Sequence, residues 1–157
     1  MNMEDVTYQR LRASLVIDPM EIDRDLIELP SNIMEASEKA ANAVSEKDIA
    51  EASLKLAEAE AAHAIRMRAE DGKQPSEAYI TREVPRSLEV RKAVEALEDA
   101  KLNAALWKAL VEALRAKKSS LETMSTLIVA GFLTTDHIVR HRRSEMNAKR
   151  NQRRSLD

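Results

Sequence analysis

The chain has 157 residues, a formal net charge of −2 and 44% hydrophobic residues, of which few are aromatic. With two glycines, four prolines and no cysteine, the composition excludes a strand-rich fold with many turns, disulfide bridges and cysteine nucleophiles, and it fits a reducing cytoplasm. No run of about 18 apolar residues occurs and the chain begins with acidic residues, so we expect neither a membrane span nor a signal peptide. The remaining residues are strong helix formers, which predicts an all-α fold.

Residues 1–30 are predicted to form an acidic segment of two short helices. The first spans residues 3–17, and Asp18 and Pro19 then supply the N-cap and the first position of the second. Pro30 is expected to end this helix or to begin the next one. Because the first part of the chain is rich in acids, it is a candidate docking surface for a protein partner.

Residues 31–70 contain neither proline nor glycine, which predicts a first long helix. Apolar and small residues recur in it at steps of three and four, as in a coiled-coil seam, so we expect the histidine among them to lie in a core or an interface. This seam comprises Ile49, Ala52, Leu56, Ala59, His63 and Met67. A capping-box pattern at residues 45–48 allows a break or bend within the helix.

The clearest turn follows at residues 71–75, where Gly72 is suited to end a helix and Pro75 blocks its continuation. Ser76 then begins a short segment that Pro85 closes. A second long helix is predicted from Pro85 to residue 130, with Gly131 as its cap. Its helically spaced apolar residues are Val90, Val94, Leu97, Ala104, Trp107, Val111, Leu114, Leu121 and Ile128.

Each long segment would extend roughly 60 Å, which is too long for a compact globule. The predicted architecture is therefore a long antiparallel, coiled-coil-like hairpin over residues 31–133 that packs against copies of itself. A second apolar face at Leu102, Leu106 and Leu110 indicates a neighbouring subunit beside the hairpin partner. Core or oligomer contacts are predicted for Leu56, Leu97, Leu106, Trp107, Leu110 and Leu114.

Residues 134–157 are predicted to form a basic helix or tail. From residue 137 onwards, seven Lys or Arg stand against two acids, and the total of −2 leaves −7 for residues 1–136. Such a density of cations favours sequence-independent contact with nucleic acid, although a solubilising terminus is the alternative. Membrane-surface binding is less favoured because the tail lacks an apolar face. The basic residues are Arg140, Arg142, Arg143, Lys149, Arg150, Arg153 and Arg154.

A smaller basic group comprises Arg66, Arg68 and Lys73, which are candidate DNA contacts or else ordinary cations at a helix C-terminus. Lys117 and Lys118 are expected to lie on a solvated helix face. The carboxylates also fall opposite the apolar stripes, and no catalytic motif with a nucleophile, a zinc pair or a phosphate loop occurs. We therefore expect a protein that is not an enzyme and uses no cofactor.

Two histidines, His137 and His141, are spaced so that one helix face could present both to a metal ion. No third ligand is evident and the neighbouring arginines would repel a dication. No metal site is predicted.

The order and spacing of several segments resemble phage recombination mediator proteins of the UvsY type, over roughly residues 15–140. The segments are Leu26-Ile27-Glu28-Leu29-Pro30, Ala64-Ile65-Arg66-Met67-Arg68, Gly72-Lys73-x-Pro75-Ser76-Glu77-x-x-Ile80, Trp107-x-x-Leu110, Leu114-x-x-Lys117, Gly131-Phe132 and His137-Ile138.

The resemblance implies an all-helical protein that assembles into oligomeric rings and binds single-stranded DNA. It implies a partner recombinase, which the protein helps to load onto strands covered by single-strand-binding protein, in the cytoplasm of a phage-infected bacterium. Carried over by position, Arg66 and Arg68 would contact DNA. The Arg-rich stretch after Arg143 is longer than the family pattern, and it is a candidate second DNA-binding arm particular to this chain.

Two other functions are compatible with the sequence. One is a helical scaffold or adaptor that oligomerises and carries a basic tail for nucleic acid. The other is a duplex-DNA-binding phage packaging subunit, which would need a helix-turn-helix with a short turn, and no such pair is evident.

Overall fold

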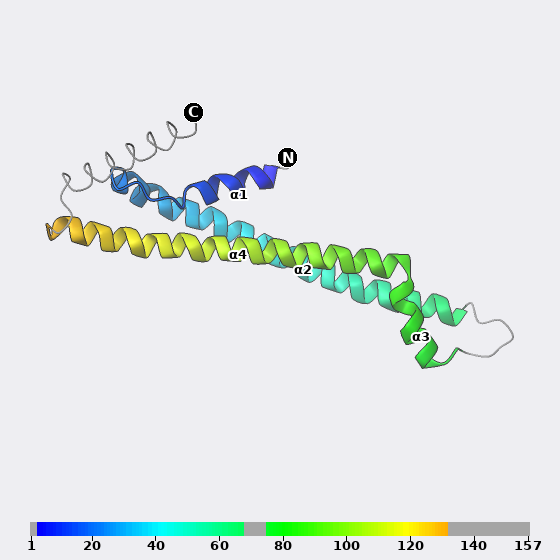
Figure 1. Cartoon of the computed structure of the whole chain (residues 1–157). Helices are drawn as coiled ribbons and strands as arrows, with labels where there is room; N and C mark the ends of the chain where they lie inside the picture. Colours follow the sequence, from blue (N-terminus) through cyan, green and yellow to red (C-terminus); the bar gives the residue numbers. More distant parts are fainter. Residues whose placement is uncertain (1–2, 68–74, 132–157) are drawn as a thin grey trace, which may run out of the picture. The chain divides into compact units, whose positions relative to one another are not determined.

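The computed structural model describes residues 3–67 and 75–131, and within these ranges it contains helices and turns but no strand (Figure 1). A long pair of helices, α2 and α4, packs together, so the all-α prediction and the pairing of two long helices are confirmed. The elements are α1 (Met3–Ala13), α2 (Ile22–Met67), α3 (Glu77–Glu83), the 3-10 helix η2 (Val84–Arg86) and α4 (Leu88–Val129).

The chain divides into two compact units. Among the described residues, the terminal unit contains 3–34 and 112–131, and the central unit contains 35–67 and 75–111. In the terminal unit, α1 and the first part of α2 pack with the last part of α4, which runs antiparallel to α2 (Figure 1). The buried apolar side chains of this unit are Leu11, Ile22, Leu29, Leu114 and Leu121.

The connection from α1 to α2 is a turn rather than the start of a second short helix. The Asp18 carboxylate accepts a hydrogen bond from the Met20 backbone N–H at 2.9 Å, and the Asp18 carbonyl accepts one from the Glu21 N–H at 2.9 Å. An aspartate side chain that bonds two residues ahead stabilises a turn in this way. The helix therefore begins at Ile22, four residues after the expected N-cap.

Pro30 lies inside α2, which continues without interruption from Ile22 to Met67. The expected boundary between residues 30 and 31 therefore falls within one helix, and the capping-box pattern at residues 45–48 causes no break. A proline in a helix removes one hydrogen bond, here to the Leu26 carbonyl, and crowds the preceding turn. Pro30 is exposed, so its ring displaces no core side chain.

In the central unit, α2 contacts α4 through small residues. Ala36 and Ala43 are buried, and they continue a repeat of seven residues along one face of α2. Alanine at such positions allows two helix axes to approach closely, within the usual range of about 8–10 Å. The repeat comprises Ile22, Leu29, Ala36, Ala43, Ala50 and Ala57.

Most of the facing residues of α4 in the central unit are larger than alanine, and most were predicted. Val90, Leu97, Ala104, Trp107 and Val111 are buried. Val94, which was expected among them, is exposed. Large side chains on α4 thus complement the small side chains on α2.

The predicted α2 seam lies outside this contact. Ile49, Leu56 and Met67 are 64%, 60% and 73% exposed, and His63 is exposed as well. At 3.6 residues per turn, the seam and the alanine repeat lie roughly 130° apart around the helix. The seam and the alanine repeat both have coiled-coil spacing. The alanine repeat makes the contact with α4 because the bulky side chains of α4 fit only against small residues.

The ends of the short elements follow the predicted signals. Ser76 caps α3, its hydroxyl accepting from the Tyr79 N–H at 3.3 Å, and Ile80 is the buried residue of that helix. Pro85 occupies the first turn of η2. Gly131 has a φ of +78°, which a left-handed helix cap requires, and its N–H donates to the Ile128 carbonyl at 3.0 Å.

Candidate nucleic-acid and partner interfaces

Arg66 lies in the last turn of α2, where cations are favoured by the helix dipole. Its Nη2 atom lies 3.0 and 3.3 Å from the two carboxylate oxygens of Glu77, in the first turn of α3. Both side chains are exposed, so the ion pair contributes little to stability and a phosphate could replace the carboxylate.

The other predicted DNA contacts lie outside the described residues. They are Arg68, Lys73, Arg140, Arg142, Arg143, Lys149, Arg150, Arg153 and Arg154, and the histidines His137 and His141 lie there too.

A groove of about 760 Å³ opens in the central unit between α2, α3 and the start of α4. Its apolar lining includes Ala57, Ala61, Ile65, Pro75 and Leu88. The groove was not predicted from the sequence. It forms because small residues on α2 leave space beside α3.

The charged residues of this groove disfavour an anionic ligand. Glu60, Glu83 and Glu89 line it, and Arg86 is the single cation among its lining residues. Arg86 is paired with Glu83 at 2.9 Å between Nη1 and Oε1. A nucleic acid would meet an excess of negative charge here, so the groove is not the proposed path for DNA.

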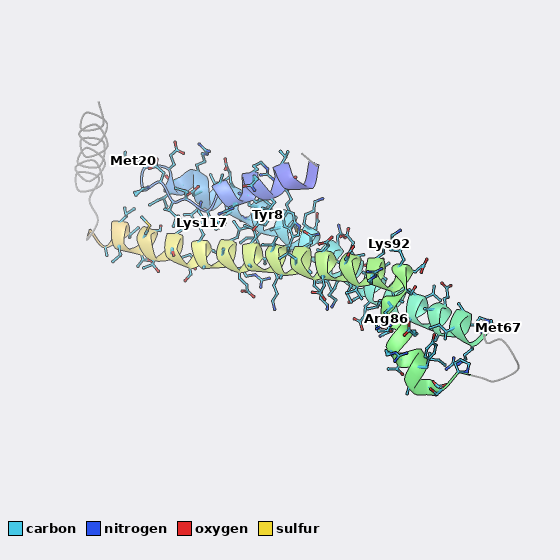
Figure 2. The ribbon with its side chains drawn as sticks, turned by 45° about the vertical axis from the view of Figure 1, so that its right-hand side comes forward. Tyr8, Met20, Met67, Arg86, Lys92 and Lys117 are labelled. Carbon is cyan, nitrogen blue, oxygen red and sulfur yellow. The ribbon has the colours of Figure 1, made fainter. Side chains whose placement is uncertain are left out.

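Lys117 is buried in the terminal unit, on the side of α4 that faces α1 and the start of α2 (Figure 2). Its ammonium nitrogen lies 2.8 Å from Asp25 Oδ2 and donates to the Ser14 carbonyl at 2.6 Å and the Val16 carbonyl at 3.3 Å. One cation thus joins α2, α4 and the connection after α1. The expectation of a solvated face for this lysine is wrong.

For Lys118, the next residue, the prediction of a solvated helix face is correct. Its side chain is 60% exposed, with Nζ 3.7 Å from Glu122 Oε1. The sequence offers a weak signal for the difference, because Lys117 stands three residues after Leu114 and four before Leu121, both fully buried. A lysine between two buried leucines at helical spacing needs a buried acceptor, which the turn after α1 supplies.

The residues predicted for core or oligomer contacts divide into two groups. Leu97, Trp107, Leu110 and Leu114 are buried within the chain itself. Leu56 and Leu106 are exposed, as is Leu102 on the predicted second face of α4. A face of α2 and a face of α4 in the central unit therefore present leucine to solvent.

The α2 stripe is the name used here for the exposed face of α2 in the central unit. Its residues are Ile49, Ala52, Leu56, Ala59, His63 and Met67. Asp48 at its edge pairs with Lys47 at 3.0 Å, and the hydrogen bond and negative charge of Asp48 raise the pKa of Lys47 above its ordinary value. Lys55 at the same edge pairs with Glu51 at 3.0 Å.

Within residues 3–67 and 75–131, no group of three or more histidine or acidic side chains is arranged to hold a metal ion. None of the helices in the described part of the chain is long and apolar enough to cross a membrane.

Comparison of the chain with protein families, with curated proteins and with solved structures finds no match. The resemblance to phage recombination mediators therefore rests on the sequence segments quoted above, and it stays a prediction.

Proposed function

We propose that this chain is a non-enzymatic, self-associating helical protein that binds single-stranded DNA and acts as a recombination mediator in a phage-infected bacterial cytoplasm. In this role it helps to load a strand-exchange recombinase onto DNA covered by single-strand-binding protein. The DNA-binding part is carried by one observation: seven Lys or Arg stand against two acids from residue 137 onwards. The recombinase-loading part rests on the resemblance alone.

The charge distribution supports DNA contact at some surfaces of the chain and opposes it at others. Cations that neutralise phosphates release counterions, which gives binding without sequence readout. The acidic lining of the central groove opposes such contact, whereas Arg66 at the end of α2 is exposed and pairs with the exposed carboxylate of Glu77. Several copies in one assembly would add weak contacts of this kind through effective concentration.

The first experiment measures binding of the purified chain to fluorescent oligo-dT and to a matched duplex across a salt series. We expect preference for the single strand and affinity that falls steeply with salt. A variant truncated after Arg140 lacks six of the seven tail cations, so its salt dependence should be flatter by about 0.7 per lost phosphate contact. No binding to either probe at low salt would remove the mediator proposal.

A pair of variants tests the site at the end of α2. Arg66→Gln should weaken oligo-dT binding, whereas Glu77→Gln should strengthen it by releasing the guanidinium from its carboxylate partner. Lys101→Gln is the matched control, since Lys101 is also in an exposed ion pair, with Glu98 at 2.8 Å. Equal weakening by Arg66→Gln and Lys101→Gln, which each remove one positive charge, would mean that net charge alone, and not this site, governs binding.

A helical scaffold or adaptor is the second candidate. The exposed α2 stripe favours it, because a helix that presents leucine and isoleucine to solvent has a surface suited to another protein. Retained self-association without DNA binding would support this second function.

A further inference from the structure

We propose that two copies of this chain pair in parallel and in register along the α2 stripe. The inference rests on the self-association part of the proposed function, and it names the surface and the orientation.

The stripe has the composition of a coiled-coil seam that is not covered by the described part of the chain. With Ile49 at an a position, Leu56 and His63 occupy the next two a positions, and Ala52 and Ala59 occupy the d positions. All five side chains are exposed. Large residues at a supply apolar area and alanine at d allows close approach, so the seam suits a second helix.

The flanking charges identify that second helix as another copy in parallel. In a parallel pair, a g residue faces the e residue five positions later on the other helix. Lys55 at g then faces Glu60 of the second copy, and Asp48 faces Ser53. No like charges meet at the g and e positions, and Arg66, at the d position after Ala59, marks the end of the apolar seam. An antiparallel pair centred on the same stripe would place Lys55 beside residues 61–62 of the second copy, which are alanines, so the ion pair with Glu60 would be lost.

Lys55 is able to change partners at small cost. Its side chain is 71% exposed and its present ion pair is with Glu51, one turn earlier on the same helix. Such exposed pairs contribute little to stability. Pairing with Glu60 of the second copy therefore replaces one surface ion pair with another while burying the apolar stripe.

The pairing has a consequence at the end of α2. A parallel, in-register pair places the two Arg66 residues at the same end of the joined helices, so a single strand meets two equivalent cations. The stripe extends only from residue 49 to residue 67, about 27 Å of helix, so the pairing is expected to depend on protein concentration.

The absence of cysteine from the chain allows a direct test by disulfide cross-linking. In a parallel, in-register pair, residues at d positions face their own copies. Ala52→Cys and Ala59→Cys should therefore each form homodimers under mild oxidation, without DNA present. Glu58→Cys, which is exposed on the opposite side of α2, is the control. Cross-linking of the two d-position variants at no more than the control level would overturn the proposal.

Sedimentation of two further variants separates this face from the leucine face of α4. Leu56→Glu should shift the chain toward monomer, whereas Leu102→Glu, at an equally exposed leucine of the central unit, should not. Circular dichroism checks that both variants remain helical. The reverse pattern would assign the interface to α4 and overturn the proposal. Because these assays use no DNA, and oligo-dT titration reports DNA binding alone, failure of pairing and failure of the proposed function are distinguishable.

Discussion

Lys117 shows how a lysine can be stable inside a helical bundle. Removing an ammonium group from water is costly unless hydrogen bonds and an opposite charge replace the solvent. Here two backbone carbonyls and the Asp25 carboxylate do so. The carbonyls belong to the turn after α1, where no helix partner is available for them, so the lysine also satisfies acceptors that need a donor.

Replacing this lysine should destabilise the terminal unit. Lys117→Ala leaves the Asp25 carboxylate and two carbonyl groups without their donor, at an expected cost of roughly 3 kcal/mol in the free energy of unfolding. Urea denaturation followed by circular dichroism measures this. Lys118→Ala is the matched control and should change stability by less than about 0.5 kcal/mol. Similar values for the two variants would contradict the assigned role.

For single residues, the sequence predicts which apolar side chains are buried better than it predicts which charged side chain is buried. The periodicity of α4 places Leu97, Trp107 and Leu114 in the core, and they are buried. It does not separate Lys117 from Lys118, because a step of seven residues from Val111 leads to Lys118. The burial of Lys117 depends on carbonyl groups about a hundred residues away in the chain, and no local pattern contains them.

Pro30 in the interior of α2 is the main irregularity at the scale of the elements. The helix continues through it because the residues on both sides pack: Ile22 and Leu29 are buried before it and Ala36 after it. Tertiary packing often outweighs the local preference of a single residue. The rule that proline ends a helix was therefore a poor guide here.

Pro30→Ala should stabilise the chain. Alanine restores the N–H that the Leu26 carbonyl lacks and relieves crowding of the preceding turn, so we expect a gain of about 1–3 kcal/mol in urea denaturation. Pro85→Ala is the control, because Pro85 lies in the first turn of η2, where a proline is tolerated. An unchanged or lower midpoint for Pro30→Ala would show that the helix depends on the proline.

Some helix ends were predicted well, but the start of α2 lies four residues after the expected N-cap Asp18. The face of α2 that packs against α4 was also predicted wrongly. Ser76 caps α3 and Gly131 follows the end of α4, as expected. Pro85 lies inside η2, and the second long helix begins at Leu88, three residues after the predicted start. Alanines occur both in the α2 stripe and in the seven-residue repeat, so hydrophobicity alone predicts that the stripe, which also has isoleucine and leucine, packs against α4. The alanine repeat makes this contact because the facing side chains of α4 are large. The central groove was missed for the same reason, because it depends on how α3 lies beside small residues.

At the scale of the whole molecule, the acidic N-terminal part and the basic C-terminal part suggest separate partners. The N-terminal part also contributes to the fold, since Leu11 is fully buried and the carbonyls of Ser14 and Val16 hold Lys117. A deletion of this part would therefore combine loss of a docking surface with loss of core.

Deleting residues 1–17 should lower the free energy of unfolding by at least about 3 kcal/mol, because one buried leucine alone contributes 2–5 kcal/mol. Thermal denaturation of the truncated chain measures this, and an unchanged midpoint would contradict the structural role. Partner docking is better tested by reversing exposed charges, as in Asp23→Lys and Glu28→Lys, which leave the buried leucine in place.

The seven-residue repeat on α2 and the matching face of α4 also limit how the chain can change in length. An insertion of one residue in either helix would rotate every later side chain by about 100° and turn the packing face toward solvent. Only a whole heptad, added to or removed from both helices at facing positions, preserves the contact. Homologues of different length would thus be expected to differ by multiples of seven residues within the paired helices, and by arbitrary numbers elsewhere.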